Sequence, residues 1–197
     1  MTTYEGVPEL CREAYDAAFA AIRDCFRAGG KLLLCGNGGS AADCAHIAGE
    51  LVKGFLKKRP LSEALQSAIG ADWAGWLQQG LPAIDLTANA AVATATLNDI
   101  DGESVFAQQV TAFGKPGDVI IGISTSGNSE NVCRALQTAR AMGLTTVGMT
   151  GADGGRMRAL SDFLLNVPAK ETYRVQELHL PLYHELCARV ERFFFPI

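Results

Sequence analysis

Short hydrophobic runs alternate with longer amphipathic segments along most of the chain. Five apolar runs, each bounded by glycine, proline or polar residues, occupy residues 31–35, 82–86, 118–124, 145–149 and 163–167. Runs of this length without polar alternation are typical of strands buried on both faces of a parallel sheet. The pattern therefore predicts five buried parallel strands.

The segments between these runs carry apolar residues at helical spacing. Residues 7–28 place Ala14, Ala18 and Ile22 on one face before Gly29 and Gly30 end the helix, and we expect this helix to serve packing, including packing between subunits. Strands that alternate with helices imply right-handed crossovers and an α/β fold with a parallel sheet covered on both faces. Further helices are predicted at residues 40–57, where Arg59 and Pro60 end the helix, at 87–97, at 103–113, from the turn at 125–129 to 143, at 157–160 and at 173–194.

Residues 61–81 interrupt this regular alternation. They contain both tryptophans of the chain, Trp73 and Trp76, and they resemble two short helices broken at Gly70. We interpret them as a helical insertion in a single domain that spans residues 1–197. Aromatic side chains more often cover apolar surface than close a site, so an extra contact between subunits is favoured over a lid, which remains the alternative.

Composition and charge exclude several classes of protein. The 197 residues are 48% hydrophobic, which is enough for one sizeable core, and the net charge of −4 offers no basic face for nucleic acid. Six isolated cysteines without a CxxC pair indicate free thiols in a reducing compartment. No run approaches the roughly 18 apolar residues of a membrane span. We expect a cytoplasmic protein without nucleic-acid or membrane partners.

Two polar turns directly follow predicted strands. GNGGS at residues 36–40 follows the first strand, and STSGNS at residues 124–129 closes the third. Glycines such as Gly38 and Gly39 let a backbone approach a ligand closely, hydroxyls donate hydrogen bonds, and the following helices add their positive ends. The two turns could hold one phosphate with neutral donors. Helix capping is the alternative, but four hydroxyls within six residues favour phosphate.

A second set of polar residues lies on two predicted helices. His46 and Glu50 are four residues apart and share a helix face, whereas Gln176 and His184 are eight apart, about 80° around the helix axis. These side chains could bind Zn²⁺ or another divalent ion, and a carboxylate with a histidine could equally move protons. The alternative is that both histidines are structural. We interpret His179 as a structural or supporting group, and we expect Pro181 to bend the last helix.

Four motifs occur in order and together resemble the SIS (sugar isomerase) phosphoheptose isomerases. They are CGNGGSAADCAHIAGEL, ISTSGNSENV, TGADGGRM and RVQELHLPLYHEL, and the resemblance covers almost the whole chain apart from residues 61–81. It implies a three-layer αβα sandwich with a five-stranded parallel sheet, of the flavodoxin-like doubly wound type. It also implies a homotetramer with active sites between subunits. The implied reaction is aldose–ketose isomerisation of sedoheptulose 7-phosphate to D-glycero-D-manno-heptose 7-phosphate, a lipopolysaccharide precursor, through an enediol.

The resemblance also assigns roles to residues by position. Glu50 and His184 resemble the proton-transfer pair, and His46, Glu50, Gln176 and His184 are similar to the family's zinc set, with one ion per subunit. The residues that resemble substrate contacts are Asn37, Gly38, Gly39, Ser40, Asp99, Ser124, Thr125, Ser126, Ser129 and Gln176.

One departure and one rival function qualify these expectations. Gly54 stands where the family usually has an arginine, and Lys53 or Lys57 could substitute for that charge. The rival is a non-enzymatic SIS protein, either a sugar-phosphate sensor or a replication-initiator-associating tetrameric scaffold. Such proteins tend to keep the serine turns and to lack the Glu and His set, so His46, Glu50 and His184 favour an enzyme.

Overall fold

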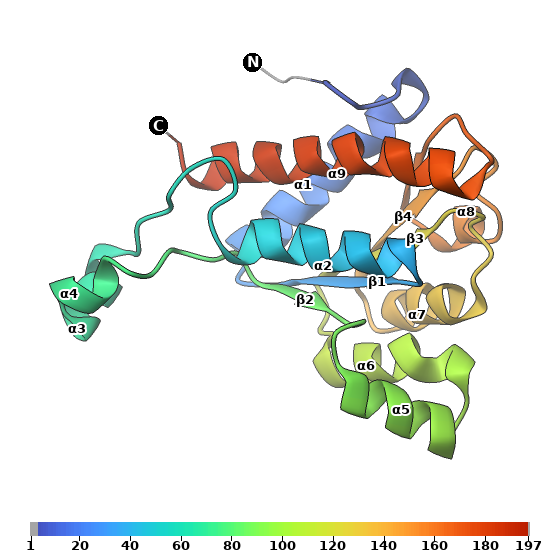
Figure 1. Cartoon of the computed structure of the whole chain (residues 1–197), viewed down its shortest axis with the longest axis horizontal. Helices are drawn as coiled ribbons and strands as arrows, with labels where there is room; N and C mark the ends of the chain where they lie inside the picture. Colours follow the sequence, from blue (N-terminus) through green and yellow to red (C-terminus); the bar gives the residue numbers. More distant parts are fainter. Residues whose placement is uncertain (1–3, 197) are drawn as a thin grey trace.

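Five parallel strands form one central sheet in a computed structural model, which describes residues 4–196 (Figure 1). Their order across the sheet is β2-β1-β3-β4-β5. After β1 the chain adds β2 on one side of it, and it then crosses to add β3 on the other side. The carboxyl ends of β1 and β3 flank this reversal, which is where ligands bind in open α/β sheets. Each strand lies within one residue of its predicted range. The strands are β1 (Leu32–Gly36), β2 (Ala83–Asp85), β3 (Val119–Ser124), β4 (Thr145–Thr150) and β5 (Phe163–Asn166).

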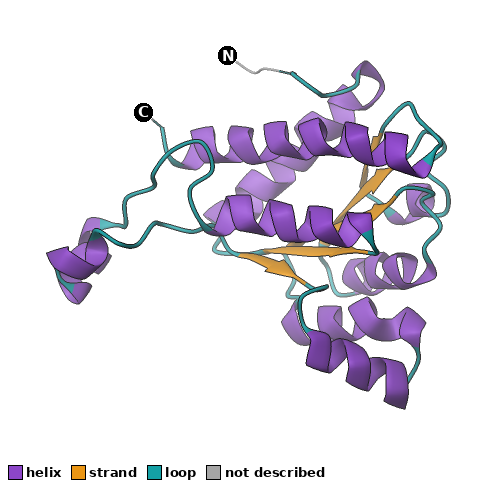
Figure 2. Ribbon diagram, in the orientation of Figure 1, coloured by secondary structure: helices purple, strands orange, loops and turns teal. Residues whose placement is uncertain are grey.

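Helices cover both faces of the sheet, and this arrangement confirms the three-layer αβα sandwich (Figures 1 and 2). On one face lie α1 (Arg12–Arg27), α2 (Gly39–Val52) and α9 (Thr172–Phe194). On the other lie α6 (Val105–Phe113), α7 (Glu130–Ala141) and α8 (Met157–Leu160), with α5 (Ala90–Asp99) against α6. Short 3₁₀ turns, Glu9–Cys11 and Gly102–Ser104, precede α1 and α6.

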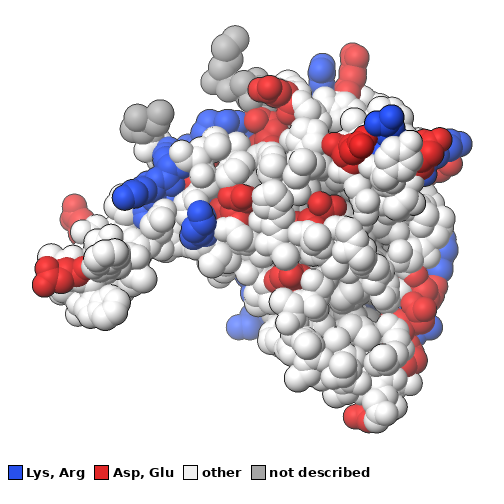
Figure 3. Space-filling view, in the orientation of Figure 1, with Lys and Arg blue, Asp and Glu red and all other residues white. Residues whose placement is uncertain are grey.

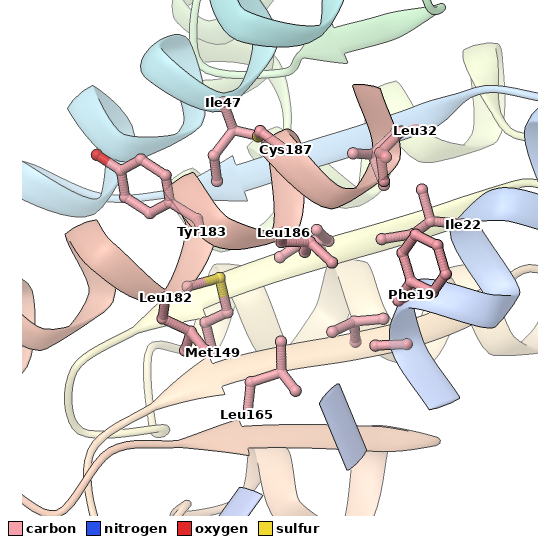
Figure 4. Packing of buried hydrophobic residues seen from close by; sticks show 14 of the residues in the cluster. Phe19, Ile22, Leu32, Ile47, Met149, Leu165, Leu182, Tyr183, Leu186 and Cys187 are labelled. Carbon is pink, nitrogen blue, oxygen red and sulfur yellow. The ribbon is translucent and has the colours of Figure 1, made fainter. Parts of the chain in front are cut away.

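Alternating strand residues supply two separate cores. In β1, Leu32 and Leu34 pack toward α1, α2 and α9, whereas Leu33 and Cys35 pack toward α6 and α7. Figure 4 shows the first core, where Leu186 of α9 lies among side chains from α1, α2 and the strands. All six cysteines are buried and free, as the sequence predicts. Within residues 4–196, no helix is both long and apolar enough to cross a membrane.

The predicted end of α2 at residue 57 is wrong, because the helix stops at Val52. The chain turns back after Gly54, and the side chain of Arg59 donates to the carbonyl oxygens of Glu50 at 2.7 Å and Leu51 at 2.6 Å. A helix that continued to residue 57 would use these carbonyls itself. The predicted start of α1 at residue 7 is also too early, because Pro8 precedes the 3₁₀ turn.

Residues 61–81 form an arm that projects from the body (Figure 1). The two predicted short helices are present, α3 (Glu63–Ile69) and α4 (Ala71–Ala74), and Gly70 separates them with a φ of 87°. Trp73 is 68% exposed and Trp76 is 84% exposed. The arm extends beyond the carboxyl end of α2, on the side away from the turns that follow β1 and β3. In a single copy it therefore does not cover those turns.

A core leucine and an arm tryptophan should differ sharply in their contribution to stability. Leu34 is fully buried, so Leu34→Ala is expected to lower the free energy of unfolding by about 2–5 kcal/mol. Trp76→Ala is expected to change it by less than about 0.5 kcal/mol, because the side chain is mostly in water. Urea unfolding followed by far-UV circular dichroism measures both. A loss with Trp76→Ala as large as that with Leu34→Ala would show that the arm packs on another surface.

Candidate active site

A cavity of about 320 Å³ opens where the two polar turns meet the start of α9. The lining side chains that the structure describes are all uncharged, and both α2 and α7 begin at its rim. An anion in this cavity would be held by N–H groups, hydroxyls and the positive ends of two helices. The lining residues are Asn37, Gly38, Gly39, Ser40, Ile123, Ser124, Thr125, Ser129, Thr172 and Gln176.

Local contacts fix the shape of the second turn. The hydroxyls of Ser124 and Ser129 lie 2.8 Å apart, so the two ends of the turn are joined by a hydrogen bond. Gly127 has a φ of 67°, and a Cβ atom there would overlap the carbonyl group of Gly154. The positive φ and the close backbone both require glycine. The turn therefore presents its hydroxyls in one fixed arrangement.

Asn131 links the two turns, and sequence reasoning missed it. The amide of Asn37 donates to Oδ1 of Asn131 at 2.9 Å, and the amide of Asn131 donates back to Oδ1 of Asn37 at 3.0 Å. The two turns are thus held together by a reciprocal pair in this chain. Asn131 lies within the ISTSGNSENV motif, one residue into the first turn of α7, and that position was the available signal.

The packing of α2 against α9 brings His46, Glu50 and His184 together. Nε2 of His46 lies 3.1 Å from Oε1 of Glu50 and 3.3 Å from Nε2 of His184. The candidate ligand atoms of all three side chains lie within 4.8 Å of one another. Spacing along the chain could not predict this meeting, because His46 and His184 are 138 residues apart. One cluster therefore holds two imidazoles and a carboxylate.

Two further residues that the sequence analysis missed, Tyr183 and Asp43, orient His46. The Tyr183 hydroxyl donates to Oδ1 of Asp43 at 3.2 Å and lies 3.0 Å from Nδ1 of His46. Because that hydroxyl has a single proton and donates it to Asp43, its oxygen is free to accept from Nδ1–H of His46 in the tautomer protonated at Nδ1. Nε2 of His46 then presents a lone pair toward Glu50 and His184. Burial raises the pKa of Asp43, and the Tyr183 hydrogen bond opposes the rise.

The cluster could hold a metal ion. Tetrahedral Zn²⁺ with bonds of about 2.0–2.1 Å separates neighbouring ligand atoms by about 3.4 Å. The two separations of 3.1 and 3.3 Å are close to that value. The contact of Tyr183 with the other nitrogen of His46 is the kind of support that metal-bound histidines use. Partial burial and the neighbouring His46 lower the pKa of His184, which favours the neutral imidazole that a metal or a proton requires.

Comparison with known proteins identifies the family. The family model for the SIS domain matches residues 3–75 and 70–151. The phosphoheptose isomerase of Crocosphaera subtropica is 45% identical over 93% of this chain and 84% of the relative, and that of Burkholderia pseudomallei is 46% identical over 93% and 82%. The solved phosphoheptose isomerase of Neisseria gonorrhoeae has a TM-score of 0.77 at 36% identity and covers 93% of this chain and 88% of that one.

The chain belongs to the phosphoheptose isomerase family of SIS-domain proteins. Gln176, which the family resemblance places in the zinc set, lines the cavity and packs against Gly39 at the start of α2. Its role as a metal ligand stays a prediction.

Two of the substrate contacts predicted from this family lie outside the cavity of their own chain. Ser126 is exposed, and its hydroxyl accepts from the backbone N–H of Asn128 at 3.2 Å. Asp99 is exposed at the end of α5 and accepts from the amide of Asn98 at 2.7 Å. Their roles in substrate binding stay predictions.

The space next to Gly54, where the phosphoheptose isomerases usually carry an arginine, is already filled. A Cβ atom on Gly54 would overlap the carbonyl oxygen of Lys57 and the side-chain oxygen of Gln78, which comes from the arm. Lys53 caps the carboxyl end of α2, and Nζ of Lys57 donates to the carbonyl oxygen of Phe195. Both lysines therefore lie at the end of α2 opposite the cavity. Gly54 lies at this same end of α2, and the substitution of either lysine for the arginine stays a prediction.

His179 has a structural environment, as the sequence analysis expected. It is fully buried, and its Nε2 lies 3.2 Å from the carbonyl oxygen of Thr150 at the end of β4. The helix α9 runs from Thr172 to Phe194 without interruption at Pro181. His179 therefore anchors the middle of α9 to the sheet.

Buried His179 should make stability depend on pH. Burial lowers the pKa of His179 to about 4, against about 6.5 in the unfolded chain. Between these values the unfolded chain binds a proton that the folded chain does not, so the stability that is present above pH ~6.5 is lost as the pH falls toward 4. The expected loss is about 3 kcal/mol.

The variant His179→Gln isolates this effect, because Gln can still donate to Thr150 and does not titrate. Urea unfolding at several pH values is expected to show a steeper fall of stability with acid for the parent chain than for the variant. Equal slopes would mean that His179 is protonated in the folded state as easily as in water.

Proposed function

We propose that this chain interconverts sedoheptulose 7-phosphate and D-glycero-D-manno-heptose 7-phosphate. The observation that carries the proposal is the placement of an anion cavity and a carboxylate–imidazole cluster along the single helix α2. Ser40 at the cavity and His46 at the cluster are separated by about 9 Å along the helix, and Glu50 lies one further turn away. A substrate with a phosphate at one end and a reacting carbonyl at the other matches this separation.

In the proposed mechanism Glu50 acts as the base. Its carboxylate removes a proton from C1 of the ketose, the electrons move to the C2 oxygen, and a cis-enediol forms. Return of a proton to C2 gives the aldose. His184 assists by moving a proton between the two oxygens, a role that suits a histidine whose burial favours the neutral form. Stabilisation of the developing negative oxygen provides much of the rate enhancement in such reactions.

The same residues could hold a metal ion. We propose His46, Glu50 and His184 as ligands of one Zn²⁺ per subunit, with Gln176 as the fourth ligand that the family implies. Such an ion would polarise the substrate oxygens. A carboxylate has two oxygens, so Glu50 can contribute one to the ion and keep the other for the proton.

We also propose a homotetramer in which neighbouring copies complete the site. Figure 3 shows that the surface over α5 and α6 is largely uncharged. Leu97 and Ile100 are 63% and 58% exposed there, with Asp99 between them. A second copy packed on this surface would bury the two apolar side chains. Asp99 of the first copy could then reach the cavity of the second. The six buried free thiols support a cytoplasmic location.

The scaffold alternative is less well supported. The relatives that match over most of the chain carry the name phosphoheptose isomerase. In addition, a scaffold requires neither the convergence of His46, Glu50 and His184 nor the contacts of Tyr183 and Asp43 that orient it.

Replacement of the proposed base tests this function. Glu50→Gln keeps the size of the side chain and its contact with His46, so the fold should be retained. The turnover of sedoheptulose 7-phosphate is expected to fall by about 10²–10⁴-fold, the contribution typical of a general base. Affinity for inorganic phosphate, measured by calorimetry, should change by less than about threefold, because the cavity is unaltered.

Glu177→Gln provides the matched control. Glu177 is on α9, its side chain is 57% exposed, and it forms an ion pair with Arg174 at 2.7 Å. This variant should turn over within twofold of the parent chain. Unchanged turnover by Glu50→Gln would remove Glu50 from the chemistry, and an inactive parent chain, with or without added Zn²⁺, would favour the scaffold.

A further inference from the structure

Arg59 is a buried arginine at the root of the arm, and all three of its side-chain nitrogens have partners. The side chain is fully buried. Nη2 donates to the carbonyl oxygen of Glu50 at 2.7 Å, Nη1 donates to that of Leu51 at 2.6 Å, and Nε donates to Oε1 of Glu191 at 2.8 Å. The guanidinium thus caps the carboxyl end of α2 with a positive charge, where the helix dipole favours one.

Glu191 on α9 completes the arrangement. Its carboxylate accepts the backbone N–H groups of Phe55 and Leu56, both at 2.8 Å, in addition to Nε of Arg59. It is 1% exposed. Hydrogen bonds and the ion pair lower the pKa of Glu191 against the opposing effect of burial. Glu191 of α9 therefore holds the segment that follows α2, through two backbone N–H groups and the guanidinium of Arg59.

This ion pair and the reacting groups share the same two helices. Arg59 holds the peptide carbonyl of Glu50 itself, the proposed base. Glu191 is seven residues after His184 on α9, so the two side chains project from nearly the same face, about 20° apart. A displacement of α2 along α9 would separate Glu50 from His184 and would have to break the Arg59–Glu191 pair.

We propose that Arg59 and Glu191 are positioning residues for the isomerisation, and this inference rests on the proposed roles of Glu50 and His184. Neither residue touches the reacting groups with its side chain. They fix the longitudinal position of α2 against α9. A misplacement of about 1 Å at a reacting group can cost about 10²-fold in rate. Buried ion pairs contribute little net stability compared with apolar residues, so specification of one helix register is the better explanation for this pair.

The chain contains a matched control for a purely structural effect. Asp118 is 2% exposed, accepts the backbone N–H groups of Lys31 and Lys115 at 2.9 and 2.8 Å, and pairs with Nζ of Lys31. Glu191 has the same partners in kind: two backbone N–H groups and one cation. Asp118, however, directly precedes β3. It therefore lies at the amino ends of the strands, whereas the cavity lies at their carboxyl ends.

The experiment compares Glu191→Gln, Arg59→Lys and Asp118→Asn with the parent chain. Steady-state isomerisation of sedoheptulose 7-phosphate gives kcat and KM, and kcat is divided by the folded fraction measured by circular dichroism in the same buffer. Glu191→Gln and Arg59→Lys are expected to lower kcat at least tenfold. Their KM should change by less than threefold, because the phosphate cavity lies at the other end of α2. Asp118→Asn should lower the urea midpoint and leave kcat within twofold.

Two results overturn the inference. One is a kcat per folded molecule within twofold of the parent for both Glu191→Gln and Arg59→Lys. The other is an equal loss of kcat with Asp118→Asn, which would mark the effect as general destabilisation. Failure of the proposed function gives a different pattern, because then either the parent chain is inactive or Glu50→Gln is as active as the parent.

Discussion

The contact between α2 and α9 is the constraint on which the rest of the site depends. Glu50 and His46 come from the first helix and His184 from the second, and their atoms meet within 4.8 Å. Apolar packing of Ile47 and Leu186 in the shared core holds the helices together, but apolar side chains specify position less sharply than directional bonds (Figure 4). The directional bonds between the two helices are the charged contacts of Arg59 and the hydrogen bonds of Tyr183.

The helix α2 also sets the geometry of the site along its length. Its amino end opens into the uncharged cavity, where the dipole favours an anion, and its carboxyl end carries a buried guanidinium, which the dipole also favours. The proposed reacting groups of α2, His46 and Glu50, lie between these two ends. The distance from a phosphate at the amino end of α2 to the proposed base would therefore be determined largely by the rise of this helix.

The sequence predicts the parts of this structure that depend on local pattern. The strands lie within one residue of their predicted ranges because each is a short apolar run between glycine, proline or polar residues. The predicted end of α2 was wrong because the side chain of Arg59 binds the last carbonyl groups of the helix. The spacing of hydrophobic residues carries no information about such a contact. Asn131, Asp43 and Tyr183 were missed for the same reason, since each acts through a residue that is more than 90 positions away.

Solvent deuterium incorporation tests the central claim, proton transfer through an enediol, most directly. Sedoheptulose 7-phosphate is incubated with the parent chain in D₂O for many turnovers, and the products are analysed by NMR. The account predicts deuterium at C2 of the heptose 7-phosphate and at C1 of the recovered ketose, because the proton that Glu50 takes from the substrate exchanges with solvent while the enediol is bound. Complete retention of hydrogen at both carbons would contradict it, since that result indicates direct hydride transfer between the carbons.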